Sequence, residues 1–224
     1  IHLSDPHIES DILYGHDSVY RFKLALSHIT KHHKDANQFV ITGDLTHFGK
    51  KKSYDKFNLI LNQSKLPKNL YPKLMIGNHD SRENFKDIFT KIPTDKNGFI
   101  QYFEDIDDKR FIFLDTNLPK TDQGYYCEKR QKWLVDILEN SKDKFIYIFM
   151  HHNPLPLGYL SSDKIGLQQR EEFKLIINRY REIIKHIFFG HQHITTSGSY
   201  LNIPFSAPRS TWNPLIPNFS KNYR

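Results

Sequence analysis

The chain has 224 residues, of which 38% are hydrophobic and 14% aromatic, which suffices for one α/β domain with a sizeable core or at most two small domains. Its mean hydropathy of −0.62, together with the lack of any long apolar run, excludes a membrane-spanning protein. The formal net charge is +7, which suits an anionic substrate or a nucleic acid. The basic residues are scattered, with Lys50-Lys51-Lys52 as the one run, so most of this charge is interpreted as a lysine-rich surface.

A single cysteine, Cys127, excludes an internal disulfide and fits a reducing compartment, so we expect a cytoplasmic protein. No signal peptide is visible. The sequence starts inside a strand pattern at Ile1 without a methionine, which leaves open what lies upstream. Thirteen histidines are many for this length, and several directly follow apolar runs, so metal binding is the first question.

Apolar runs and segments of helical spacing alternate along the first half of the chain. We predict strands at Ile1–Leu3, Phe39–Ile41 and Tyr71–Ile76. The helices predicted between and after them cover about Ser18–Lys34, Ser53–Leu61 and Phe85–Phe89.

The second half begins with strands at Phe99–Phe103 and Phe111–Leu114, joined by a charged turn, Glu104–Lys109. Two helices are predicted next, at Tyr125–Leu138 and Phe173–Ile184. The predicted strands follow these helices at Phe145–Met150 and Ile187–Phe189, and a hairpin strand is predicted at Thr195–Ile203. The tail, Pro204–Arg224, is predicted to wrap the surface. This order favours two sheets packed face to face with helices outside.

The tetrapeptide Gly77-Asn78-His79-Asp80 follows the apolar run Leu74-Met75-Ile76, at the point where a buried strand ends. Ligands of open α/β sheets collect at that edge. Asn78 offers a carbonyl oxygen, His79 a group that exchanges protons near neutral pH, and Asp80 an anion that can hold an imidazole. Alone, the tetrapeptide reads equally well as a turn with a solvated histidine.

Other strand ends carry the same residue types, namely Asp5, His7, Asp44, His151, His191 and His193. Carboxylates combined with neutral imidazoles suit Fe, Mn, Zn or Co. Two such ions need about seven or eight ligands with one carboxylate shared, and the chain supplies that number.

Each of these residues also has a plain structural interpretation. A lone aspartate after a strand, such as Asp5 or Asp44, is commonly a helix cap. We interpret six further histidines as surface or core residues: His2, His16, His28, His32, His33 and His186. The interpretation of His47 is left more open, because it follows Asp44 closely. Chance placement of all the strand-end residues together is the weaker explanation.

The series Asp5-x-His7, Gly43-Asp44, Gly77-Asn78-His79-Asp80, His151-His152 and Gly190-His191-x-His193 resembles the calcineurin-like metallophosphoesterases over nearly the whole chain. Further segments resemble the class III cyclic nucleotide phosphodiesterase branch: Leu114-Asp115-Thr116, Gly124, Arg130–Leu134, Met150–Pro154 and Pro204–Pro208. The resemblance implies one domain over residues 1–224, built as an α/β sandwich of four layers with two mixed sheets flanked by helices.

The resemblance also implies roles. Asp5, His7, Asp44 and His193 would hold one metal ion, and Asp44 would bridge to a second ion completed by Asn78, His151 and His191. His79 would face the substrate, Asp80 would orient His79, and His152 would lie just outside the ligand shell. Two residues depart from the branch pattern at the expected edge of the cleft: His47, where an aspartate is common, and Asn153, where a proline is common.

These roles imply hydrolysis of small phosphodiesters, with 3′,5′-cyclic nucleotides as the first expectation. Two cations would neutralise the phosphoryl oxygens and lower the pKa of a bridging water, and His79 would protonate the leaving oxygen. A phosphomonoesterase or nucleotide pyrophosphatase with the same site remains open, and a non-catalytic scaffold is disfavoured by the intact His79.

The expected partner is a small anionic phosphoester. A DNA nuclease is disfavoured because the chain ends soon after His193 and shows no basic-aromatic stripe. No membrane association is expected, and a homodimer, common in this branch, stays open.

Overall fold

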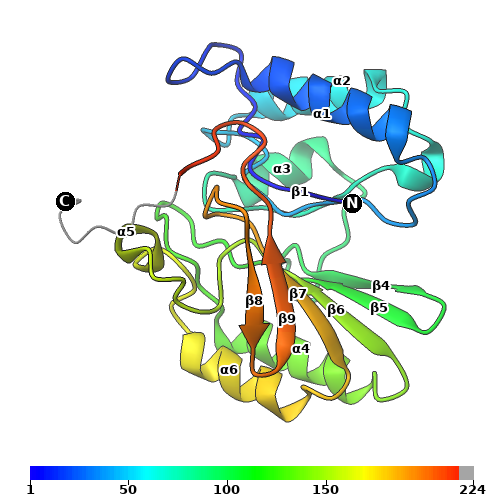
Figure 1. Ribbon diagram of the computed structural model, residues 1–224, viewed down its shortest axis with the longest axis vertical. Coiled ribbons are helices and arrows are strands. Elements are labelled where there is room, and N and C mark those ends of the chain that lie inside the picture. Colours follow the sequence, from blue (N-terminus) through cyan, green and yellow to red (C-terminus); the bar gives the residue numbers. More distant parts are fainter. Residues whose placement is uncertain (217–224) are drawn as a thin grey trace.

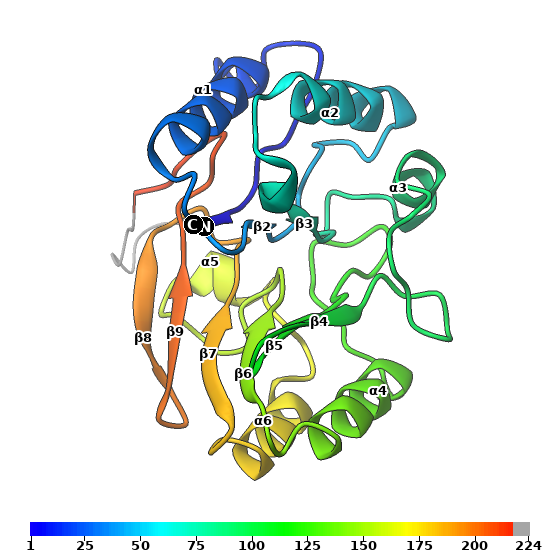
Figure 2. The same ribbon diagram turned by 90° about the vertical axis from the view of Figure 1, so that its right-hand side faces the viewer.

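Two sheets pack face to face between two pairs of helices in the computed structural model, which describes residues 1–216 (Figures 1 and 2). One sheet has the strand order β1-β2-β3 and the other β4-β5-β6-β7-β9-β8. Helices α1 and α2 cover the small sheet, and α4 and α6 cover the far face of the large sheet. The predicted α/β sandwich of four layers is therefore confirmed.

The small sheet and its helices come from the first third of the chain. Its strands are two residues each, β1 (His2–Leu3), β2 (Val40–Ile41) and β3 (Lys73–Leu74), and they alternate with α1 (Ser18–His32), α2 (Lys51–Gln63) and a short 3₁₀ turn at Lys68–Leu70. Helix α3 (Arg82–Ile88) follows. Both strand pairings are parallel, so within the described residues this sheet is not mixed, contrary to the expectation.

The large sheet is mixed, because β4 (Tyr102–Ile106) and β8 (Thr196–Tyr200) pair antiparallel with β5 (Lys109–Phe113) and β9 (Ile203–Ala207). Its central pairs are parallel and include β6 (Phe145–Phe149) and β7 (Ile184–Phe188). The intervening helices are α4 (Glu128–Glu139), α5 (Leu160–Asp163) and α6 (Arg170–Arg179).

Three element predictions were wrong in this half. The strands β4 and β5 run through most of the predicted turn at 104–109, which leaves only Asp107 and Asp108 as the turn. Helix α6 ends at Arg179 and Ile184 already opens β7. Pro204 lies inside β9 rather than in a tail, and residues 217–224 of the predicted tail lie outside the described part.

The alternation of side chains along the central strands builds two separate cores. On β6, Phe149 packs between the sheets while Ile146 and Ile148 face α4 and α6. Phe149 stacks on Phe188 at 4.6 Å and on Phe113 at 5.3 Å between ring centroids. Because successive side chains of a strand point to opposite faces, a fully apolar strand can serve both cores.

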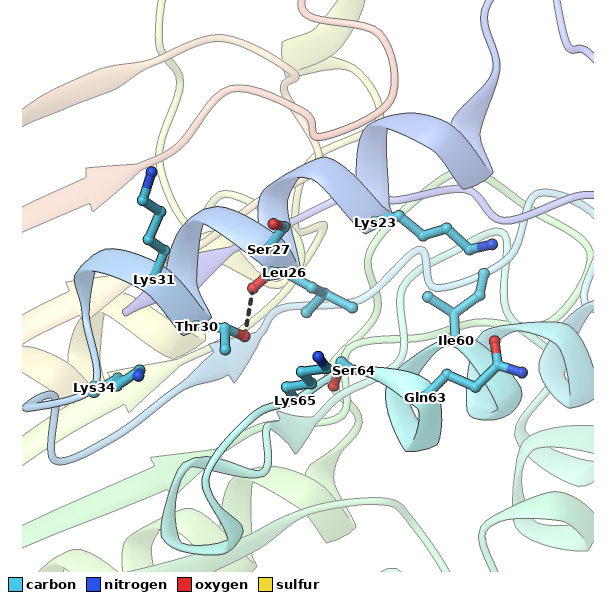
Figure 3. Close-up of a pocket in the computed structure, with 10 residues that line it drawn as sticks. All are labelled: Lys23, Leu26, Ser27, Thr30, Lys31, Lys34, Ile60, Gln63, Ser64 and Lys65. Carbon is cyan, nitrogen blue, oxygen red and sulfur yellow. Dashed lines mark hydrogen bonds between the residues drawn. The ribbon is translucent and has the colours of Figure 1, made fainter.

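A basic groove of about 480 Å³ lies between α1 and α2, with Lys23, Lys31, Lys34 and Lys65 on its walls (Figure 3). Lys31 is in the last turn of α1, Lys34 follows the C-terminal end of α1, and Lys65 follows the C-terminal end of α2. Lysines there complement the negative ends of the helix dipoles, which accounts for these three of the four lysines without a ligand. Within residues 1–216, no helix combines the length and apolar character needed to cross a bilayer.

Candidate metal centre

The seven predicted ligands lie together in the loops that follow β1, β2, β3, β6 and β7, where the two sheets meet. Backbone hydrogen bonds tie these loops to one another, as from the Asp5 amide to the Gly43 carbonyl (3.2 Å) and from the Gly190 amide to the His151 carbonyl (3.0 Å). The His191 amide also donates to Asp5 Oδ2 at 3.2 Å, which joins residues 186 positions apart in the chain. That these seven residues bind metal stays a prediction.

The first cluster consists of Asp5, His7, Asp44 and His193, whose nearest ligand atoms all lie within 4.8 Å of one another. His7 Nε2 lies 3.2 Å from His193 Nε2 and 3.4 Å from Asp44 Oδ2. Asp5 Oδ1 lies 3.4 Å from His193 Nε2 and, although buried, has no hydrogen-bond partner within residues 1–216. A buried carboxylate oxygen without a donor is costly unless a cation satisfies it, so this cluster fits a metal ion.

The second cluster forms around Asn78, whose Oδ1 lies 3.0 Å from both His151 Nε2 and His191 Nδ1. His151 Nε2 is also 3.4 Å from Asp44 Oδ1. The two oxygens of Asp44 therefore face different clusters, Oδ2 the first and Oδ1 the second. This is the geometry that a bridging carboxylate needs.

His152 is fully buried beside the second cluster, with its ring centroid 4.6 Å from that of His191. Its Nδ1 pairs with Thr116 Oγ1 at 2.7 Å, while its Nε2 has no partner among the described residues. His152 is thus a third imidazole that offers a ligand atom close to those of His151 and His191.

The charges of the clusters suit cations. Burial alone would raise the pKa of Asp44, but His151 and His7 outweigh it and hold that pKa well below its usual value. Burial lowers the pKa of His191 to about 3, which leaves a neutral imidazole able to coordinate. Burial would also lower the pKa of His151, yet Asp44 and Asp5 raise it to about 9. The carboxylates thus attract positive charge, which a metal ion can supply in place of the His151 proton.

The backbone is strained at five of the seven predicted ligands. Asp5, His7, Asp44, His191 and His193 have φ angles of 55°, 44°, 49°, 67° and 56°. Such left-handed conformations cost about 1–3 kcal/mol each in residues other than glycine and persist where the surrounding structure enforces them. The fold therefore maintains an unfavourable backbone to aim these side chains at one place.

Gly77 is required by close packing against the ligands. A Cβ on this residue would lie 2.2 Å from Asp44 Oδ1 and 2.6 Å from His151 Nε2. Gly190 is equally crowded, since its Cβ would lie 1.9 Å from Ser4 Oγ. These glycines let the loops approach close enough to form the clusters.

His79 lies in the wall of a cavity of about 700 Å³ beside the second cluster. Its Nδ1 donates to the His47 carbonyl oxygen at 2.8 Å, which leaves Nε2 available to a ligand. The cavity walls carry three cationic side chains, Arg82, Lys86 and Lys120, and three acidic ones, Asp80, Glu83 and Asp87.

The predicted role of Asp80 as the orienting partner of His79 is wrong. The Asp80 carboxylate accepts the backbone N–H groups of Leu45 (3.0 Å) and Gly77 (3.0 Å) and the Tyr54 hydroxyl (2.8 Å). Burial and nearby Asp44 raise the pKa of Asp80 to about 6. Asp80 therefore ties together the loops of β2 and β3, and a backbone carbonyl orients His79.

Asn153 was expected at the edge of the cleft but is fully buried. Its Oδ1 accepts from Gln192 Nε2 at 2.6 Å, and its Nδ2 donates to the Leu155 carbonyl. It supports the loop that carries His191 and His193 instead of meeting a substrate.

A second group of buried hydrogen bonds, around Asp115, supports the turn at 77–80, and its role was not predicted from the sequence. The buried Asp115 carboxylate accepts Arg82 Nε at 2.7 Å and Arg82 Nη2 at 2.8 Å, and also the Asn117 amide. Asn117 Nδ2 in turn donates to the carbonyls of Gly77 and Asp80. Two signals in the sequence pointed to Asp115: its position directly after an apolar strand, as for the ligands, and its place in the branch-like segment Leu114-Asp115-Thr116.

We expect Asp115→Ala to lower the free energy of unfolding by about 3–5 kcal/mol, because it leaves the Arg82 guanidinium without its buried partner. The matched control is Asp105→Ala, whose carboxylate binds Arg110 with the same two distances, 2.7 and 2.8 Å, but is 35% exposed. Exposed ion pairs contribute about 0.2–1 kcal/mol to the free energy of unfolding. Urea denaturation measures both, and equal losses would contradict a special role for the buried pair.

Comparison with known proteins agrees with this geometry. The family model described as "Calcineurin-like phosphoesterase" matches residues 1–195. A probable cyclic nucleotide phosphodiesterase of Rhodopseudomonas palustris is 32% identical over 200 residues, which cover 88% of this chain and 71% of that protein. The glycerophosphodiester phosphodiesterase GpdQ of Enterobacter lignolyticus is 27% identical over 89% of this chain and 72% of its own length.

Among solved structures, a dimetal phosphatase from Danio rerio superposes with a TM-score of 0.76 at 13% identity, covering 94% of this chain and 86% of that one. At this identity the likeness concerns the fold alone.

Proposed function

Because this chain belongs to the calcineurin-like phosphoesterase family and is a metal-dependent phosphoesterase, we propose that it hydrolyses small phosphodiesters at a centre of two metal ions. One observation carries the proposal: the two oxygens of Asp44 face two adjacent clusters of ligand atoms, with His79 beside them in the cavity wall.

The proposed ligand sets are the two clusters, with Asp44 common to both. The mixture of carboxylates, imidazoles and one amide oxygen suits Mn, Fe, Zn or Co. When bound, such ions supply positive charge against the phosphoryl oxygens and make the attacking water more acidic.

The remaining steps fall to the protein's own groups. His79 donates its Nδ1 proton to a backbone carbonyl, so its Nε2 is the atom that can give a proton to the leaving oxygen. Lys86 and Lys120 in the cavity wall can contact the anionic substrate. Asp80 and Asn117 keep the turn at 77–80 in place, which fixes His79 relative to Asn78.

The diester preference rests on two supports. The relatives at 32% and 27% identity are named as phosphodiesterases, one probably for cyclic nucleotides and one for glycerophosphodiesters. The cavity of about 700 Å³, with His79 in its wall, also has room for an organic substituent in addition to a phosphate group. A phosphomonoesterase or nucleotide pyrophosphatase would use the same centre, and is the alternative that the next experiment addresses.

On metal-loaded protein we expect bis-(p-nitrophenyl) phosphate and 3′,5′-cyclic AMP to have a kcat/KM at least about 10-fold higher than p-nitrophenyl phosphate, because a diester fills the cavity on both sides of the phosphorus. Initial rates across such a panel, with glycerophosphodiesters and dinucleotide pyrophosphates included, measure this order. A higher kcat/KM for the monoester would favour the phosphatase alternative.

A further inference from the structure

One imidazole of the first cluster, His7, has another side chain as the partner of its second ring nitrogen. His193 of the same cluster and His151 of the second cluster each pair their Nδ1 atom with a backbone carbonyl, of Asn213 at 2.9 Å and of Thr42 at 2.8 Å. His7 instead places its Nδ1 atom 3.2 Å from Nδ1 of another side chain, His47. A carbonyl can only accept a proton, whereas an imidazole nitrogen can donate or accept, so the tautomer of His7 depends on that of His47.

If His7 binds a cation, one assignment of the ring protons of His7 and His47 is consistent with this geometry. His7 Nε2 is the atom among the carboxylates, 3.4 Å from Asp44 Oδ2, and must present a lone pair there. The proton of His7 then sits on Nδ1 and is donated to His47 Nδ1, and His47 carries its own proton on Nε2. The two tautomers are thereby linked.

Hydrogen bonds and ring packing fix the position of His47 next to His7. The next residue, Phe48, donates its amide to Glu9 Oε1 at 3.2 Å, and the Glu9 carboxylate is buried and also accepts the Ser53 hydroxyl. The His47 ring stacks on the His79 ring at 4.7 Å with 26° between planes, and its carbonyl accepts from His79 Nδ1. One residue thus contacts both a proposed ligand and the proposed proton donor.

We propose that His47 is a positioning residue that acts through both ends: its ring fixes His7 in the tautomer that binds the first metal ion, and its carbonyl orients His79. This rests on the proposed function, because it takes His7 as a ligand. Partners of this kind outside the ligand shell typically change metal affinity or activity by about 10–100-fold. His47 is not needed as a ligand itself, since its Nδ1 faces the side of His7 that points away from the carboxylates.

Mutation can separate the role of the His47 ring from the role of its backbone carbonyl. His47→Ala removes the ring but keeps the carbonyl that orients His79. His47→Asn restores an acceptor, because the amide oxygen of asparagine can take the place of Nδ1. The control is His186→Ala, which removes a partly buried histidine that pairs with Ser206 on the large sheet, away from both clusters.

The test is titration of chelator-treated full-length protein with Zn²⁺ against a chromophoric competitor. We expect His47→Ala to weaken one of the two Zn²⁺ sites by about 10–100-fold, His47→Asn to recover most of this loss, and His186→Ala to match the wild type. In ¹⁵N NMR spectra of the Zn²⁺-loaded wild type, the His7 imidazole should carry its proton on Nδ1. A merely structural role would give neither recovery by asparagine nor a fixed tautomer.

Unchanged Zn²⁺ affinity in His47→Ala, or a His7 proton on Nε2, would overturn the proposal for His47. Equal weakening in the alanine and asparagine variants would overturn it too, since the acceptor would then not matter. His7→Ala distinguishes this from failure of the proposed centre: two Zn²⁺ ions still bound tightly in that variant would remove His7 from the ligand set.

Discussion

Asp44→Asn is expected to cost the protein high affinity for both metal ions and to lower turnover by at least about 10³-fold, because neutralising charge at the phosphate accounts for several kcal/mol of the barrier. The reason is its position: Asp44 Oδ2 lies 3.4 Å from His7 Nε2, and Asp44 Oδ1 lies 3.4 Å from His151 Nε2. The substitution keeps the shape of the side chain and removes one negative charge that both clusters share.

Elemental analysis after loading with Mn²⁺ or Zn²⁺ measures the effect, with Asp55→Asn as the control. Asp55 is an exposed aspartate on α2, so its variant should keep the metal content and rate of the wild type. Two ions retained in Asp44→Asn would contradict the bridging role. Loss of one ion alone would assign Asp44 to a single cluster.

The general position of the site could be predicted because the ligands follow buried strands. Val40 and Ile41 are buried and apolar, and Asp44 follows them in the loop; the same holds for His151 after β6. Parallel strands bring their carboxyl ends to one edge, so residue type and strand end together are informative. The calcineurin-like resemblance rested on these positions and is confirmed by the family comparison.

The contacts that support the ligands could not be predicted, because they are set by which loops meet in space. Nothing in the tetrapeptide at 77–80 shows that Asp80 reaches the amide of Leu45, 35 positions earlier. The adjacency of Asp80 to His79 suggested a contact that the backbone geometry does not make. Likewise, the richness of residues 204–224 in Pro, Asn and Ser suggested a tail, yet Pro204 lies in β9, between β7 and β8.

His79→Ala should leave the metal content unchanged and lower the rate in proportion to how poorly the substrate's leaving group departs. His79 Nδ1 is committed to the His47 carbonyl, and its ring lines the cavity, so its Nε2 is the atom that can protonate a leaving oxygen. A nitrophenolate leaves readily without a proton, whereas a ribose or glycerol alkoxide does not. General acid catalysis typically contributes about 10²–10⁴-fold.

We therefore expect a loss of about 10²–10⁴-fold on a cyclic nucleotide or alkyl diester and a much smaller loss on bis-(p-nitrophenyl) phosphate. The ratio of the two losses is the measurement, because any general disturbance of the centre lowers both rates alike. Equal losses with two ions still bound would mean that His79 stabilises phosphate charge or positions the substrate. Loss of an ion would make His79 a ligand, and His7, His47 and His79, each with one ring nitrogen within 4.8 Å of those of the other two, would then form its site.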